Sequence, residues 1–187
     1  MKHIVRRMFW DFEKEEAWLN KMSAKGLLLS SYSWCRYVFD EGTPNEYTYR
    51  IELLEHVPTH PESVAYIKFL EQSGIECVAT YGRWIYLQRK SSEGAFDIYS
   101  DLESKIKHFQ RIHVLWNSIM IAEFIIGLCN VGIGIVNLSY NESMGKYSLV
   151  NLILGVLVLI LGLFFWRIGK PIRKKIKRFK RELAIRE

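Results

Sequence analysis

The sequence predicts an α+β domain followed by a hairpin of two membrane-spanning helices and a basic tail. Over residues 1–104, short apolar segments alternate with capped amphipathic helices, and two long apolar stretches follow. Net charge changes in the same steps: −4 over residues 1–104 (12 Lys and Arg, 16 Asp and Glu), +2 over 105–166 (4 and 2) and +8 over 167–187 (10 and 2). We therefore expect a cytoplasmic domain at 1–104, a linker helix with the transmembrane hairpin at 105–168, and a basic amphipathic tail at 169–187.

The domain is expected to contain five strands and two helices. Asp11 is typical of a helix N-cap, and the helix that it opens should end at Gly26. Thr59 and Glu62 form a capping box for a second helix, which should end near Gly74. The expected strands are 3–10, 27–39, 46–54, 75–81 and 83–89, with a turn at 40–45. This order, β-α-β-β-α-β with one added strand, predicts a ferredoxin-like sandwich in which two helices cover one face of an antiparallel sheet.

The positions of polar residues lead to two further expectations for the domain. In strand 46–54, apolar and polar residues alternate, which places Tyr47, Tyr49, Ile51 and Leu53 on one face. The acids at the start of the first helix are typical of a solvated N-terminus near the positive end of the helix dipole. They are Asp11, Glu13, Glu15 and Glu16.

Two segments, 114–138 and 148–168, are each long enough to cross a membrane, and the short segment 139–147 joins them. Basic residues lie before the first segment and after the second, so the positive-inside rule places both termini in the cytoplasm. Nothing breaks the helix that opens before the first span, and one helix is expected from Asp101 to about Leu138.

Small and polar residues recur along one face of each span. They are Glu123, Gly127, Asn130, Gly134 and Asn137 in the first span, and Asn151, Gly155 and Gly162 in the second. Such residues allow close helix packing, and an antiparallel hairpin is expected to match Asn137 with Asn151, Gly134 with Gly155 and Gly127 with Gly162. Three roles are open for Glu123. The first is structural, as an ion pair with Arg167 or an acid that reaches the cytoplasmic interface, and the others are a contact with another subunit or partner, or transport.

The C-terminal segment combines an apolar helical stripe with many cations. The stripe is Ile168, Ile172, Ile176, Phe179 and Leu183, and the basic residues are Lys170, Arg173, Lys174, Lys175, Lys177 and Arg178. Because the segment directly follows a span, anionic lipid of the inner leaflet is favoured over nucleic acid, with protein docking as the alternative.

The sequence contains no recognisable catalytic, metal-binding or cofactor-binding constellation. His56 and His60 have a metal-ligand spacing, but Pro58 lies between them and no third ligand follows, so both are interpreted as loop histidines. The three cysteines, Cys35, Cys77 and Cys129, are scattered and fit a reducing compartment. We therefore expect no enzymatic activity, metal or cofactor.

Residues 1–104 contain 17 Phe, Trp and Tyr, more than one covered sheet face can hide. Core packing, a protein-partner surface and a site for an aromatic small molecule are the three interpretations. The residues expected on a partner surface are Arg36, Arg50, Trp84 and Tyr86.

Four segments of the chain together carry a resemblance to a known family: FWDFEKEEAWLNKMSAKGLLL, CRYVFDEGTPNEYTYRIELL, FLEQSGIECVATYGRWIYLQRK and FDIYSDLESKIKHF. They resemble the bacterial domain-of-unknown-function family 2812 over about residues 3–110. The resemblance implies two spans after the domain, a Gram-positive source, and gene neighbours such as PadR-like transcriptional regulators and sometimes ABC transporters. It carries over no catalytic or binding residues.

These patterns favour a non-enzymatic, membrane-anchored interaction or sensor module with a regulatory role. It would hold a protein partner, such as a PadR-like regulator or an ABC transporter, at the inner leaflet of the bacterial cytoplasmic membrane. The alternative is an accessory subunit that contacts a transporter or membrane enzyme through the hairpin. A homo-oligomer is also open, and direct binding of nucleic acid is not expected.

Overall fold

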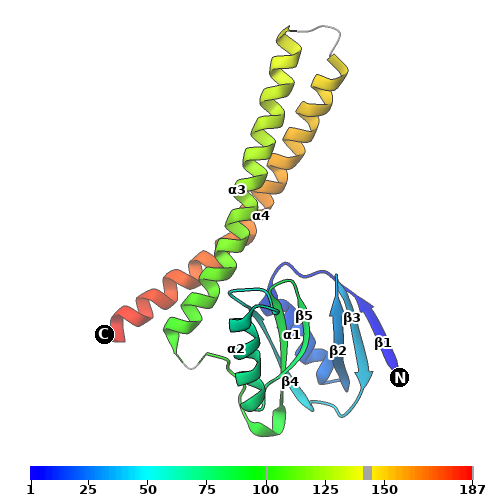
Figure 1. The fold of residues 1–187 in the computed structure, drawn as a ribbon, viewed down its shortest axis with the longest axis vertical. Helices are drawn as coiled ribbons and strands as arrows, with labels where there is room; N and C mark the ends of the chain where they lie inside the picture. Colours follow the sequence, from blue (N-terminus) through cyan, green and yellow to red (C-terminus); the bar gives the residue numbers. More distant parts are fainter. Residues whose placement is uncertain (100, 141–144, 187) are drawn as a thin grey trace. The chain divides into compact units, whose positions relative to one another are not determined.

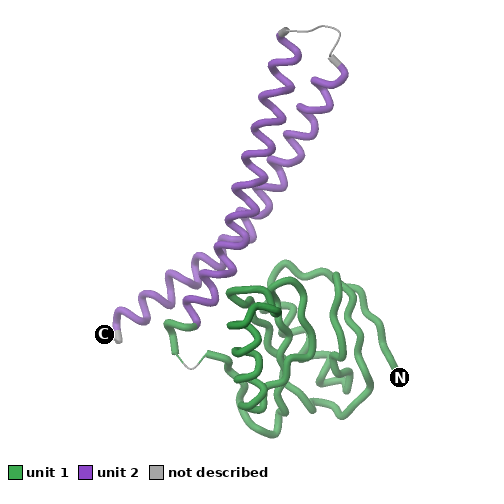
Figure 2. Tube along the Cα trace, viewed as in Figure 1, with its two compact units in different colours: residues 1–104 green, residues 105–187 purple. Residues whose placement is uncertain are grey.

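The computed structural model describes residues 1–99, 101–140 and 145–186. The chain divides into two compact units, residues 1–104 and residues 105–187 (Figure 2). Unit 1 is a mixed α+β domain, and unit 2 consists of two long apolar helices (Figure 1).

Unit 1 contains the same β-α-β-β arrangement twice in succession. In each repeat the last strand lies between the other two, so the sheet orders are β1-β3-β2 and β4-β6-β5, with antiparallel neighbours. The first repeat is β1 (Lys2–Arg6), α1 (Phe12–Ser23), β2 (Leu27–Ser33) and β3 (Arg36–Glu41). The second is β4 (Tyr47–Leu53), α2 (Pro61–Gln72), β5 (Glu76–Tyr81) and β6 (Trp84–Lys90), and a short 3₁₀ helix, η1 (Ser91–Glu93), follows it.

The α+β class is therefore confirmed, but the ferredoxin-like topology is not, because the strands form two three-stranded sheets. The long strand expected at 27–39 is a hairpin whose turn consists of Trp34 and Cys35. Both residues have positive φ, 41° and 60°, as a two-residue type I′ turn requires. Neither is Gly, Asn or Asp, the residues that usually mark such a turn, and the sequence therefore carries no signal for it.

The N-caps of the two domain helices differ in how well the sequence predicts them. Asp11 caps α1 as expected, since its Oδ1 accepts the backbone N–H of Glu13 at 3.1 Å. The N-cap of α2 is His60, one residue after the expected Thr59. Pro61 then occupies the first turn, where backbone N–H groups have no acceptor within the helix, so the lack of an N–H in proline costs no hydrogen bond.

The outer edge of β4 is bonded to side chains of α1. Asn20 accepts the N–H of Tyr49 at 2.8 Å and donates to the carbonyl of Tyr49 at 3.0 Å. Glu16 accepts the N–H of Ile51 at 3.1 Å. These side chains take the place of a further strand and so protect the edge from pairing with another chain.

The main core lies where α1 meets both sheets. Leu19 of α1 packs there with buried side chains from β2, β3, β4 and β6, namely Leu29, Tyr37, Phe39, Tyr49, Ile51 and Tyr86. The N–H of Leu29 donates to the hydroxyl of Tyr49 at 2.9 Å and so links the two sheets. A second cluster packs beneath α2 and contains Leu54, Leu70, Ile75, Ile85, Leu87 and Phe96.

In unit 2, α3 (Leu102–Tyr140) and α4 (Gly145–Arg186) lie side by side and antiparallel (Figure 1). Each contains an 18-residue window with a mean hydropathy of 2.2 or 2.7, of which only 11% or 17% is buried. The two helices are thus compatible with a two-span membrane protein. The single long α3 confirms the helix expected from Asp101, and α4 continues through Pro171 into the basic tail. Of the expected loop 139–147, residues 141–144 lie outside the described residues.

Candidate functional site

The most unusual polar group of unit 1 is the buried carboxylate of Glu15, which is 8% exposed. Its Oε1 accepts a hydrogen bond from the hydroxyl of Tyr37 and another from that of Tyr86, each at 2.7 Å. Tyr37 lies on β3 and Tyr86 on β6, so one carboxylate oxygen joins α1 to both sheets. We call Glu15, Tyr37, Tyr86 and the adjacent Tyr32 the Glu15 cluster.

The expectation that Glu15 is a solvated helix-start acid is wrong. The residue occupies the same helical stripe as Phe12, Leu19 and Met22, whose spacing of 3, 4 and 3 places all four on the inner face of α1. This periodicity is the signal that could have identified Glu15 as buried. The presence of several acids at the helix start does not reveal which of them is buried, since Glu13 next to it in the sequence pattern is only half-buried.

Burial raises the pKa of Glu15, and the hydrogen bonds from the two tyrosines act in the opposite direction. None of the ion pairs within the described residues includes Glu15. Burial and the negative charge of Glu15 also raise the pKa values of Tyr37 and Tyr86, so both stay protonated as donors. The arrangement is therefore a buried proton-binding group held by neutral donors.

Aromatic rings surround this carboxylate. The ring of Tyr32 lies between those of Tyr37 and Tyr86, with centroid distances of 4.7 and 4.6 Å. Trp18 contacts Tyr37 edge-on at 4.8 Å. A large share of the aromatic content of the sequence thus serves the core around Glu15, as the core-packing interpretation holds.

The four residues expected on a partner surface do not all lie at the surface. Arg36 is exposed, whereas Tyr86 is 2% exposed and bonded to Glu15. Arg50 is half-buried, forms an ion pair with Glu16 at 3.1 Å and lies over the ring of Phe96. Trp84, also half-buried, lies against Phe12, with ring centroids 6.0 Å apart.

Trp34 is an exposed aromatic residue outside the four positions expected on a partner surface. It lies in the β2–β3 turn, is 76% exposed, and has its ring centroid 6.2 Å from that of Tyr81. Because residue 34 lies inside the expected strand 27–39, the alternation pattern does not predict that its side chain is exposed in a turn. An exposed tryptophan beside an exposed arginine, Arg36, has the composition of a protein-contact surface.

Three glycines allow close approach between α3 and α4. A Cβ built on Gly155 would lie 2.8 Å from the backbone N of Val131 and 2.9 Å from the carbonyl oxygen of Gly127. A Cβ on Gly134 would lie 3.0 Å from the carbonyl oxygen of Ser148. The expected register was therefore wrong by about one helical turn, because Gly134 lies against Leu152 instead of Gly155, and Gly155 lies against Val131 instead of Gly134.

Among the described residues, the asparagines and Glu123 of the two helices are not joined across this contact. Asn130 donates to the carbonyl of Ile126 in its own helix at 2.9 Å. Within the described residues, no hydrogen bond links Asn137 to Asn151, and Glu123 forms no ion pair with Arg167. The shifted register explains why Glu123 does not pair with Arg167. The Cβ of Glu123 lies beside Gly162, which precedes Arg167 by more than one helical turn.

The basic tail packs partly on α3. Phe179, from the apolar stripe, is buried and lies 5.6 Å from the ring of Phe109. Lys170 lies over Trp166, with its Nζ 3.5 Å from the ring centroid. The remaining expected lipid-contact residues are exposed or half-buried on α4: Arg173, Lys174, Lys175, Lys177 and Arg178.

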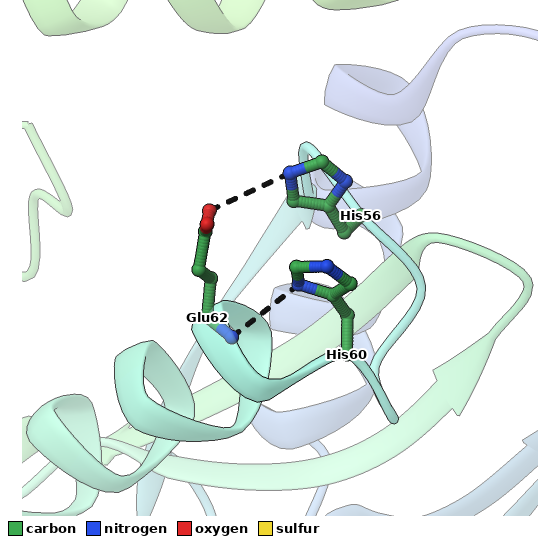
Figure 3. Close-up of side chains that lie close together, drawn as sticks. All are labelled: His56, His60 and Glu62. Carbon is green, nitrogen blue, oxygen red and sulfur yellow. Dashed lines mark hydrogen bonds and ion pairs between the residues drawn. The ribbon is translucent and has the colours of Figure 1, made fainter.

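His56, His60 and Glu62 lie together where the loop after β4 meets the start of α2 (Figure 3). The Nε2 of His56 is 3.5 Å from the Oε2 of Glu62, and the two imidazole rings stack with centroids 4.1 Å apart. Within the described ranges, this is the one group of three His, Cys, Asp or Glu side chains close enough to share a metal ion. The third member, Glu62, was not expected here, since its spacing from Thr59 is typical of a capping box.

A family model described as "protein of unknown function (DUF2812)" matches residues 11–121. The match extends from the start of α1 into the apolar part of α3 and covers more than half of the chain. No curated protein and no solved structure matches the chain. The four sequence segments quoted above overlap the matched range, and the chain belongs to the DUF2812 family.

Proposed function

We propose that this chain is a membrane-anchored cytoplasmic interaction or sensor module that holds a protein partner at the inner leaflet. The observation that carries the proposal is the exposed apolar surface of α3 and α4. Side chains such as Ile125, Leu157 and Ile160 are more than half exposed, although they lie in the most apolar part of the chain. Neither helix can cover the outward face of the other, and lipid is the solvent that makes such a surface stable.

The charge distribution supports cytoplasmic termini. Lys105, Lys107 and Arg111 precede the first apolar stretch, and Arg167 and the basic tail follow the second. Each exposed cation near an anionic leaflet contributes about 1 kcal/mol of attraction. Because Phe179 is packed on α3, the tail would bind lipid through its cations more than through its apolar stripe.

The proposed partner contact is the surface of unit 1 around Trp34 and Arg36. Tryptophan and arginine are the residues that most often carry binding energy in protein interfaces. The family resemblance makes a PadR-like regulator or an ABC transporter the natural class of partner. A regulator held in this way would be kept from its targets in the cytoplasm until it is released.

In-cell crosslinking of the tagged full chain tests this proposal, with the captured proteins identified by mass spectrometry. We expect recovery of a soluble regulator, reduced at least fivefold by Trp34→Ala. Phe69→Ala is the matched control, because Phe69 is an exposed aromatic residue on α2, away from the β2–β3 turn. Equal recovery with wild type and Trp34→Ala would contradict a contact at this turn.

A second function, as accessory subunit of a transporter or membrane enzyme, is favoured by Glu123. This acid is half-buried in an apolar helix and has no ion pair within the described residues. A carboxyl group in such a position is expected to contact another membrane protein or a second copy of the hairpin. Recovery of an integral membrane protein that Glu123→Gln abolishes, and that Trp34→Ala leaves unchanged, would support this alternative.

A further inference from the structure

We infer that His56, His60 and Glu62 form a binding site for a divalent transition-metal ion, with Zn²⁺ as the best match to the donors. One ligand atom from each side chain lies within 4.8 Å of the other two (Figure 3). The three residues come from one short segment, so the site belongs entirely to unit 1.

The backbone of this segment holds the two imidazoles on the same side. The N–H of His60 donates to the carbonyl of Val57 at 2.9 Å, which closes a turn between the histidines. The carbonyl of His56 accepts from the hydroxyl of Ser63 at 3.3 Å, and this bond ties the start of the loop to α2. Pro58 therefore shapes the turn that brings the rings together, although in the sequence it argued against a helical pair of ligands.

Two imidazole nitrogens and one carboxylate oxygen are the donor set that suits zinc and its neighbours in the first transition row. Magnesium and calcium prefer oxygen donors alone, so this set disfavours them. The Glu62 carboxylate supplies negative charge, and water would complete the coordination sphere.

Modest side-chain rotation is enough to close the site. Ligands of tetrahedral zinc lie about 3.3 Å apart, given metal–ligand distances near 2 Å. The side chains of His56 and Glu62 are 42% and 76% exposed, which leaves both free to rotate and the ion free to enter. The Nδ1 of His60 accepts the N–H of Glu62 at 3.4 Å, a long bond whose loss costs α2 little.

A stacked histidine pair beside an acid, without any metal, is the competing explanation. The chain contains a control for it: His3 lies 2.8 Å from Glu41 and is similarly exposed, at 39%, but this pair is not part of a three-ligand group within the described residues. A metal site should therefore depend on His56 and His60 and be indifferent to His3.

The test is titration of the purified full chain in detergent micelles with Zn²⁺ by calorimetry, and with Co²⁺ by absorption spectroscopy. The affinity tag must contain no histidine, and all titrations are made at one pH, about 7.5, because metal affinity depends on pH. We expect one equivalent of metal to bind, with affinity lowered at least tenfold by His56→Ala and by Glu62→Gln. His60→Asn should have the same effect while keeping an N-cap acceptor for α2, and His3→Ala should leave binding unchanged.

Two results would overturn the inference. One is wild-type affinity in the His56→Ala and His60→Asn variants, with helix content unchanged by circular dichroism. The other is a thiolate-to-cobalt charge-transfer band in the near ultraviolet, which would assign the bound metal to cysteine instead.

Discussion

Removal of the Tyr37 hydroxyl should weaken unit 1 through the charge of Glu15. Tyr37→Phe deletes one of the two donors to Glu15 Oε1, at 2.7 Å, and leaves the ring in place. A hydrogen bond to a charged group contributes about 1.5–3 kcal/mol, and we therefore expect a loss of about 2 kcal/mol. At about 1.4 kcal/mol per factor of ten, local opening becomes roughly 30-fold more frequent.

Hydrogen–deuterium exchange with mass spectrometry measures this opening in the full chain in detergent, at the peptides that contain β3 and β6. Tyr81→Phe is the control, because the half-buried Tyr81 hydroxyl makes no hydrogen bond within the described residues. On a Glu15→Gln background, the acceptor is neutral and Tyr37→Phe should cost only about 1 kcal/mol.

Either of two outcomes would refute a stabilising hydrogen bond between Tyr37 and a charged Glu15. Tyr37→Phe and Tyr81→Phe could raise exchange equally, which would mean that the hydrogen bond of Tyr37 to Glu15 adds nothing to the effect of losing a hydroxyl. Alternatively, Tyr37→Phe could have the same effect on the wild-type and Glu15→Gln backgrounds, which would mean that the bond gains nothing from the charge.

The remaining predictions concern pH, the β4 edge and the helix contact. Because burial raises the pKa of Glu15 above its ordinary value of 4.5, its stabilising contribution is complete below pH 4.5 and is lost as pH rises through the raised pKa. As pH rises above 4.5, the protection of β3 against exchange, corrected for intrinsic rates, should therefore fall in wild type relative to Glu15→Gln. The same pH dependence of protection in both proteins would contradict this. Asn20→Ala removes the acceptor for the N–H of Tyr49 and one of the two donors to its carbonyl, which also accepts from Arg50 at 3.1 Å. The substitution should cost about 2 kcal/mol, seen as roughly 30-fold faster exchange in β4, whereas an effect no larger than that of the exposed Lys21→Ala would refute the edge role. Gly155→Ala places a Cβ 2.8 Å from the backbone N of Val131 and should lower the midpoint of thermal unfolding of the helices in detergent. Gly132→Ala is the control, because its Cβ has no neighbouring atom within 4 Å and should leave the midpoint unchanged. Equal midpoints in the two variants would contradict the close contact.

Strong local signals made part of the structure predictable. Asp11 caps α1 because a carboxylate before an amphipathic segment satisfies N–H groups that the helix leaves free. The two apolar helices follow from hydropathy over a length that few soluble proteins maintain. In β4, the alternation places Tyr49, Ile51 and Leu53 in the core as expected.

Features that depend on tertiary contacts could not be predicted in this way. The turn at Trp34 and Cys35 has positive φ without the residues that favour it, so strand pairing on both sides must maintain it. Missing this turn merged β2 with β3 and led to the ferredoxin-like topology. The contact between α3 and α4 was misplaced by a turn because glycines spaced along a helix allow several registers.

The candidate sites show the same limit. Glu15 is buried because two tyrosines from distant strands donate to it, and no local pattern brings Tyr37 and Tyr86 together. The group of His56, His60 and Glu62 forms because a proline-containing turn places the rings face to face, which spacing rules for helices do not describe.

The central proposal, a domain anchored on the cytoplasmic side by two spans, is tested most directly by thiol labelling in cells. In a background with Cys35, Cys77 and Cys129 replaced by serine, single cysteines are introduced at the exposed positions Ser92 in unit 1 and Tyr147 at the start of α4. With a maleimide that does not cross membranes, we predict labelling of Tyr147→Cys in intact cells and of Ser92→Cys only after permeabilisation. Labelling of Ser92→Cys in intact cells, or recovery of the chain in the soluble fraction, would contradict the account.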